Sequence, residues 1–207
     1  MEYEVVEEYP RRGQFDFYSE HPSPFYAVTW STEIAELKAW AARNEYSIYL
    51  VLCYYMVRAM QSVEDFRYRL LDGRIVLYDR LDIGMTLPTP DGQYAFGHFD
   101  FHEDVSEFMR RVDVARSKIR VDGVLRPDDR PNRILFTSAP GVPFTSMSHV
   151  PLPDPGDARP NVAFGQFASA GDEVTVPISL QVNHRFIGGR ALGELVEAVA
   201  FQYTRPD

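Results

Sequence analysis

The spacing of apolar residues along the chain predicts two helices in its first third. Ile34, Leu37 and Trp40 share one face of a predicted surface helix over residues 31–44, and Asn44 is a plausible stop. The next run, residues 47–61, is apolar on all sides through its first three turns. That pattern is typical of a helix buried in the core, and the run is too short to cross a bilayer.

Alternation with a period of two residues predicts strands in the rest of the chain. Residues 66–79 hold two alternating runs joined by Asp72-Gly73, a dipeptide typical of a two-residue β-hairpin. The N-terminal segment also begins strand-like. The same alternation predicts further strands over residues 92–101, 133–140, 160–169 and 173–183.

Helical spacing returns twice, at 103–120 and at 190–203. In the last helix the apolar face is predicted to hold Leu192, Leu195, Val196 and Val199. Residues 122–132 read as a polar, proline-rich loop. Strands and helices therefore interleave irregularly, which predicts an α/β (α+β) two-layer sandwich with a mixed β-sheet and helices packed against it.

Length and composition favour one domain, residues 1–207, without internal repeats. The chain is 45% hydrophobic, enough for one substantial core but too short for two full domains. It carries 21 basic and 30 acidic residues, a formal charge of -9, and no block of five Lys or Arg. This balance argues against a nucleic-acid partner.

The sequence predicts neither a secretory signal nor a membrane-spanning segment. Its first twelve residues carry acids where a signal peptide needs a basic patch, and no window approaches 18 uncharged apolar residues. Cys53 is the only cysteine and lies in the apolar run 47–57, which predicts an inert core thiol and no internal disulfide. We expect a cytoplasmic protein with no membrane partner.

His184 is the first candidate for chemistry. It follows the predicted strand 173–183, precedes Gly188 and Gly189, and is followed by a helix. Folds of this class tend to place sites at the carboxyl ends of strands, so His184 could be a catalytic base. It could equally be a histidine that satisfies main-chain groups at the end of a strand.

Three further segments have both a chemical and a structural interpretation. His98, Asp100 and His102 could present metal ligands from one face of a strand, but alternation with Phe99 and Phe101 explains the same letters as a polar strand face. No second ligand cluster accompanies them, so we predict no metal.

The second segment holds Ser146 and Ser148, which follow two prolines and a glycine and lack the motif of a nucleophilic serine. A hydroxyl that stabilises developing negative charge is the functional reading, and a solvated turn is the structural one. Residues 9–26 combine Arg11 and Arg12 with many aromatic residues, which suits a pocket lining, an oligomer interface or a segment that covers the core.

Four segments, in order, resemble the chloramphenicol acetyltransferase family. They are PRRGQFDFY (10–18), FRYRLLDGRIVLYDRLDIGMT (66–86), SAPGVPFTS (138–146) and GDEVTVPISLQVNHRFIGG (171–189). The resemblance implies a homotrimer with its active sites at the subunit interfaces. It also implies acetyl-CoA or another acyl-CoA as co-substrate and a small-molecule acceptor.

The resemblance also assigns roles to residues. The second histidine of the family signature His-His-x-x-x-Asp-Gly is the general base, and it falls on His184. The serine that stabilises the tetrahedral intermediate falls on Ser146, and a tyrosine that contacts the acceptor falls on Tyr18, with Phe17 beside it. An imidazole, with a free pKa near ~6.5, suits this proton transfer at neutral pH, and no metal or covalent enzyme intermediate is required.

Three positions depart from the family pattern. Asn183 replaces the first histidine, Gly188 replaces the aspartate, and Ala163 replaces a threonine that holds a water near the oxyanion. The family aspartate pairs with an arginine that matches Arg11, so Arg11 is expected to need another acid or a differently arranged turn.

The function expected from the resemblance is CoA-dependent acyl transfer to a hydroxyl or amine of a small molecule, such as a natural product. Two alternatives stay open at this point. One is an enzyme of this fold reassigned to chemistry without CoA, such as a cyclase of a biosynthetic pathway. The other is a non-catalytic trimer that binds small molecules.

Overall fold

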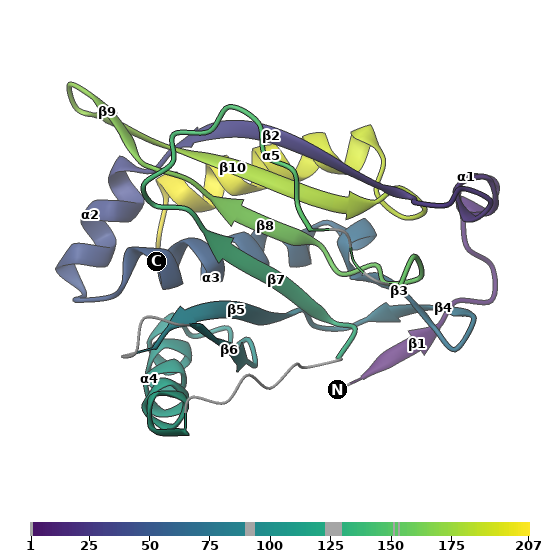
Figure 1. The fold of residues 1–207 in the computed structure, drawn as a ribbon, viewed down its shortest axis with the longest axis horizontal. Coiled ribbons are helices and arrows are strands. Elements are labelled where there is room, and N and C mark those ends of the chain that lie inside the picture. The colour runs from purple at the N-terminus through teal and green to yellow at the C-terminus, as the bar shows by residue number, and fades with distance from the viewer. Residues whose placement is uncertain (1, 90–93, 123–129, 151, 153) are drawn as a thin grey trace.

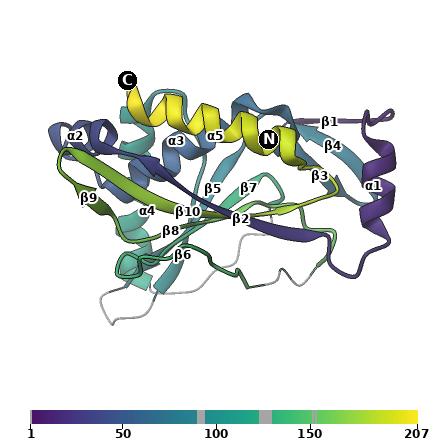
Figure 2. The ribbon, with the colours of Figure 1, turned by 90° about the horizontal axis from the view of Figure 1, so that it is seen from above.

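The computed structural model describes residues 2–89, 94–122, 130–150, 152 and 154–207. Within them the chain forms a large mixed sheet, a smaller antiparallel sheet, and helices packed on one side of the large sheet (Figures 1 and 2). The α+β class with a mixed sheet is therefore confirmed. Most of the predicted loop 122–132 lies outside the described residues.

The large sheet places the two long strands β2 and β10 side by side at one edge. Its strands in spatial order are β2 (Phe25–Glu33), β10 (Glu173–Asn183), β8 (Asn161–Phe164), β7 (Arg133–Ser138), β5 (Asp82–Pro88) and β6 (Tyr94–Phe99), with β9 (Ala168–Ala170) paired to the start of β10. Strand β7 runs parallel to both β5 and β8, and the other pairs are antiparallel.

The small sheet confirms the predicted hairpin. Strands β3 (Tyr68–Leu71) and β4 (Arg74–Tyr78) pair around Asp72 and Gly73, and β1 (Tyr3–Val5) pairs with the outer side of β4. Both turn residues have positive φ, 49° and 76°, as a two-residue turn of this kind requires.

One face of the large sheet is covered by α2 (Ala35–Arg43), α3 (Ile48–Ser62), α4 (Val105–Asp122) and α5 (Gly189–Thr204), with the short 3₁₀ helix η1 (Glu64–Arg67) after α3. Helix α1 (Arg12–Ser19) lies at the end of the sheet, beside the turn that follows β10 (Figures 1 and 2). Helix α3 is buried along most of its length, as its apolar run predicts. Cys53 lies on it, fully buried, and burial raises the pKa of its thiol well above the usual range. In the described part of the chain no helix is long and apolar enough to span a membrane.

Two predicted boundaries and one predicted buried position are wrong. The helix predicted at 31–44 begins only at Ala35, because residues 31–33 complete strand β2 against β10. The strand predicted at 160–169 is divided into β8 and β9, which both pair with β10. In α5, Val196 is 38% exposed, and the buried positions are Ala191, Leu195, Val199 and Tyr203.

Strand β10 has buried side chains on both of its faces. Ile178, Leu180 and Val182 lie in the hydrophobic core beneath the helices. Because successive side chains of a strand point to opposite faces, Ser179, Gln181 and Asn183 face the other side, where they are also buried. This row of buried polar side chains leads along the strand to His184.

Candidate active site

The turn after β10 holds His184 in a defined orientation. Its main-chain N–H donates to the Pro24 carbonyl at 2.8 Å, and its carbonyl accepts from the Gln14 amide at 2.6 Å. Its ring nitrogen Nδ1 lies 2.9 Å from the Ile187 carbonyl oxygen. A carbonyl oxygen can only accept, so Nδ1 carries the proton and Nε2 keeps the lone pair that a base needs.

Two tyrosines pack against the His184 ring. Tyr18, from α1, stacks on it with a centroid distance of 4.1 Å, and Tyr26, from β2, contacts it at 4.5 Å. The Tyr26 hydroxyl donates to the same Ile187 carbonyl at 3.1 Å. Burial, with a smaller effect of Tyr18, raises the pKa of Tyr26 to about 12, so this hydroxyl keeps its proton. Phe17, beside Tyr18 on α1, is 58% exposed and makes an edge contact with the Tyr18 ring.

Arg11 is paired in the structure, although Gly188 supplies no carboxylate. Its Nη2 lies 2.5 Å from Asp65 Oδ1, on η1, and also donates to the Tyr9 hydroxyl at 2.9 Å and the Phe186 carbonyl at 3.3 Å. Burial lowers the pKa of Arg11, but Tyr9 and Asp65 outweigh it and hold that pKa above its usual value. Of the two alternatives stated for Arg11, another acid or a differently arranged turn, the structure shows another acid, Asp65.

Asn183 still holds the turn, by contacts available to an amide. Its Nδ2 lies 3.3 Å from the carbonyls of Pro155 and Asp157, and its Oδ1 accepts from the Arg185 N–H at 3.0 Å. The side chain thus joins the end of β10 to the loop at residues 154–157.

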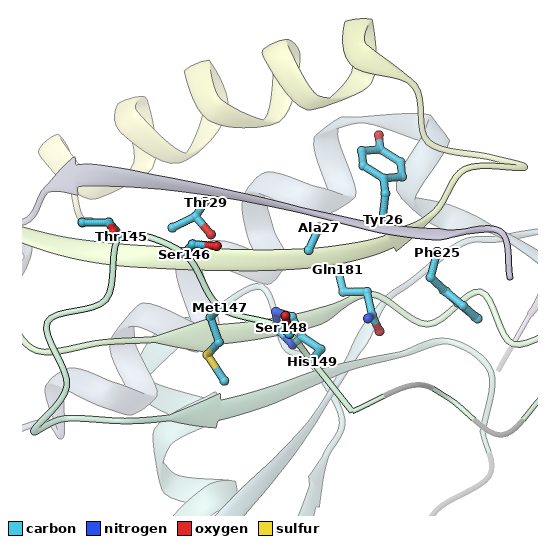
Figure 3. A pocket seen from close by; sticks show the side chains of 10 residues that line it. All are labelled: Phe25, Tyr26, Ala27, Thr29, Thr145, Ser146, Met147, Ser148, His149 and Gln181. Atoms are coloured by element: carbon cyan, nitrogen blue, oxygen red, sulfur yellow. The ribbon is translucent and has the colours of Figure 1, made fainter.

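A polar pocket of about 460 Å³ lies on the face of the sheet opposite the helices. Figure 3 shows its wall, where the segment Thr145–His149 crosses β2 and β10. The lining residues are Phe25, Tyr26, Ala27, Thr29, Thr145, Ser146, Met147, Ser148, His149 and Gln181. Ser146 and Ser148 are both exposed to this space, and the buried Oε1 of Gln181 has no hydrogen-bond partner among the described residues.

His149 fastens the segment that carries Ser146. Its Nε2 lies 2.9 Å from the Ser179 hydroxyl, which in turn lies 3.3 Å from the Met147 carbonyl. Burial lowers the pKa of His149, a contact with Asn161 opposes that effect, and the ring is neutral at neutral pH. Ala163, fully buried, pairs directly with Ser179, so that hydroxyl lies on the same sheet face as the position where the family pattern has a threonine.

Within one chain, His184 and Ser146 do not face each other. Figure 3 shows Ser146 at the end of its pocket where Thr29 lies, and the partner of Thr29 in β10 is Ser179, five residues before His184. At about 3.3 Å per residue, this separates the two positions by roughly 16 Å along the strand. Figure 3 also shows the Tyr26 ring, which contacts His184, pointing toward the helices and away from Ser146.

The predicted strand-face cluster does not form a metal site. Asp100 accepts from Arg130 and Arg133 at 3.2 Å each, and His102 Nδ1 accepts from the Asp104 N–H at 3.1 Å. His98 is half-buried on β6. Among the residues that the structure describes, no group of three or more His, Cys, Asp or Glu side chains could hold a metal ion.

Gly165→Ala is expected to displace the segment that carries Ser146. A Cβ there would lie 2.7 Å from Pro177 Cγ, 2.8 Å from a Phe144 ring carbon and 2.9 Å from the Val142 carbonyl oxygen. Overpacking of this kind costs about 1–3 kcal/mol of unfolding free energy, which chemical denaturation measures. Gly141→Ala in the same segment is the control, since its Cβ would meet nothing within 4 Å. Equal stabilities of the two variants would contradict this account of the segment.

Known proteins resemble this chain in sequence over most of its length. A family model described as chloramphenicol acetyltransferase matches residues 1–200. Chloramphenicol acetyltransferase 2 of Escherichia coli is 24% identical over 182 residues, which are 86% of this chain and 85% of that protein. A chloramphenicol acetyltransferase of Proteus mirabilis is 21% identical over 196 residues, 94% of this chain and 90% of that protein.

Solved structures share the fold. One of a chloramphenicol acetyltransferase aligns with a TM-score of 0.84 and 22% identity, over 99% of this chain and 100% of that one. A dihydrolipoamide acetyltransferase of Azotobacter vinelandii aligns with a TM-score of 0.66 and 15% identity, over 96% of this chain and 91% of that one. At these identities the structural likeness concerns the fold.

Proposed function

Because the chain belongs to the chloramphenicol acetyltransferase family, we propose that it transfers an acyl group from CoA to a hydroxyl or amine of a small molecule, with His184 as general base. The observation that carries the proposal is the 2.9 Å contact between His184 Nδ1 and the Ile187 carbonyl oxygen. Nδ1 is bound to the Ile187 carbonyl, so the lone pair on Nε2 is available to take a proton.

Each step of the proposed reaction is assigned to a named residue. Nε2 of His184 removes the proton of the acceptor as its oxygen or nitrogen attacks the thioester carbonyl. The Ser146 hydroxyl donates to the oxyanion that forms, an interaction worth about 2.7–4 kcal/mol for comparable single donors. Collapse of the intermediate then expels the CoA thiolate, which takes the proton held on Nε2 of His184 and so returns the base to its neutral form. Tyr18 and Phe17 are proposed to line the acceptor site beside the base.

For His184 and Ser146 to act on the same carbonyl group, we propose that they come from two copies of the chain. Ser146 lies beside Thr29, and the β10 partner of Thr29 is five residues, roughly 16 Å of strand, from His184, which supports a site in which the two residues come from different copies. A cyclic homotrimer of the single unit 1–207 would bring His184 of one copy against Ser146 of the next, since head-to-tail contacts repeat around a ring. We propose this arrangement, with acyl-CoA and a natural-product acceptor meeting at the interface.

Acetyl-CoA is expected to raise the melting temperature of the protein. A ligand that binds the folded state at 100 times its Kd adds about 2.7 kcal/mol to the unfolding free energy. Differential scanning fluorimetry measures the shift, with acetyl phosphate as an acetyl donor that lacks the CoA moiety. Release of free thiol with chloramphenicol and a panel of alcohols and amines as acceptors then tests turnover. No shift with any acyl-CoA at millimolar concentration would contradict the proposal.

A further inference from the structure

A buried carboxylate, Asp65, lies where η1, the turn after β10 and the start of α5 meet. The residue is only 6% exposed. Its Oδ1 lies 2.5 Å from Arg11 Nη2, and its Oδ2 lies 3.5 Å from Arg190 Nη2, in the first turn of α5. Asp65 therefore contacts one cation before the turn and one after it.

The contacts of Arg11 lead from Asp65 to the His184 ring. The guanidinium Nη2 that binds Asp65 also donates to the Phe186 carbonyl, inside the turn. The next residue, Ile187, supplies the carbonyl that holds His184 Nδ1. Phe186 itself packs against Tyr9 and Phe15, so the turn can move little once Arg11 is in place.

Gly188 has room for the carboxylate that the family pattern places there. Its φ of −111° suits any residue, and an added Cβ would meet nothing closer than the Gln14 side chain, at 3.8 Å and 3.9 Å. Gln14 lies on α1, three residues after Arg11 at the N-terminal end of that helix, so a carboxylate at 188 would enter the space beside Arg11.

We propose that Asp65 is the positioning residue for His184, and that it does in this chain what a carboxylate at position 188 would otherwise do. The inference rests on the proposed function, since positioning matters for a base. An asparagine at 65 would turn an amide N–H₂ or a weaker neutral acceptor toward the Arg11 guanidinium. Arg11 then loses its anionic partner, and its hydrogen bond to the Phe186 carbonyl weakens.

Asp65→Asn is expected to lower kcat for acyl transfer by roughly 10- to 100-fold with little change in KM for acetyl-CoA, because a base displaced by about 1 Å loses that much. The double variant Asp65→Asn/Gly188→Asp is expected to recover at least half of the loss on a logarithmic scale. Both are assayed as full-length protein, well below their melting temperatures.

The matched control is Asp82→Asn. Asp82 is equally buried, at 1% exposure, and is bound by Arg80 and Asn132 at the start of β5, remote from the His184 turn. Its replacement costs stability in a comparable way and is expected to leave kcat within threefold of wild type. A loss of kcat in Asp82→Asn equal to that in Asp65→Asn would overturn the proposal, because the effect would then be general destabilisation.

A second readout does not depend on turnover. The ¹⁵N NMR shifts of labelled histidine side chains report the tautomer, and the His184 signals are those absent from His184→Asn. Asp65→Asn is expected to lose the preference for a proton on Nδ1, and Asp82→Asn to keep it. If wild type shows no acyl transfer but the tautomer responds this way, the proposed function fails and the positioning role stands. Unchanged kcat and tautomer in Asp65→Asn, or no recovery in the double variant, would overturn the proposal.

Discussion

Replacing His184 with asparagine is expected to lower kcat for acyl transfer by roughly 10²- to 10⁴-fold, the usual contribution of a positioned general base. The asparagine amide can still donate to the Ile187 carbonyl, which His184 Nδ1 contacts at 2.9 Å, so the turn keeps its hydrogen bond. What it lacks is the free lone pair of Nε2. The KM for acetyl-CoA is expected to change little, because the base acts on the acceptor proton in the transition state.

The control for this substitution is His102→Asn. His102 is partly exposed, and within the described part of the chain its ring forms hydrogen bonds with Asp104 alone, far along the chain from the turn. Thiol release from acetyl-CoA is measured for both variants and wild type with the same acceptor. A His184→Asn enzyme as fast as His102→Asn would show that another group removes the proton.

The structure explains why the effect should be large. Five contacts hold His184: the Pro24 and Ile187 carbonyls, the Gln14 amide, and the rings of Tyr18 and Tyr26. A base held in this way needs no reorientation before it accepts a proton, which is where enzymes gain much of their rate. A histidine that only ended a strand would need the main-chain contacts but not the two tyrosine rings that pack against it.

Local features of this fold were predictable because they depend on short-range chemistry. Asp72-Gly73 adopts the positive φ angles that a tight hairpin demands, and the alternation over 173–183 matches β10 at both ends. Helix α3 follows from its apolar run. In these segments the propensity, the pattern and the tertiary environment agree.

Other features depend on contacts between distant residues, which a linear pattern does not contain. Residues 31–33 resemble the start of a helix, yet nine paired positions against β10 hold them in β2. Asp65 lies 54 positions from Arg11, and no local pattern joins the two. The alternation over 173–183 predicted a strand, but the burial of Ser179, Gln181 and Asn183 beneath residues 147–149 and 154–157 depends on contacts that no local pattern contains.

The candidate site also combines features that the local sequence predicts with features that depend on distant contacts. His184 and Ser146 could be singled out by their place in the sequence, and the structure puts His184 in a turn built to hold its ring. It also puts Ser146 in a separate pocket on the other face of the sheet. Completion of the site by a neighbouring copy accounts for both observations.

Mixed assemblies of two inactive variants are expected to regain activity. Ser146→Ala keeps the base and lacks the oxyanion donor, whose loss costs roughly 10²- to 10³-fold in kcat. His184→Asn keeps the donor and lacks the base. In any ring of three that contains both variants, one interface of the three joins an intact His184 to an intact Ser146, so the assembly should show about one third of wild-type kcat.

The decisive measurement co-expresses the two variants with different affinity tags, purifies assemblies that carry both tags, and records their thiol release from acetyl-CoA. Light scattering on the same sample should give a mass three times that of the 23.7 kDa chain. The account predicts activity near one third of wild type, at least 30-fold above either parent by the fold-losses expected of them. Doubly tagged assemblies no more active than the parents would contradict a site shared between two copies.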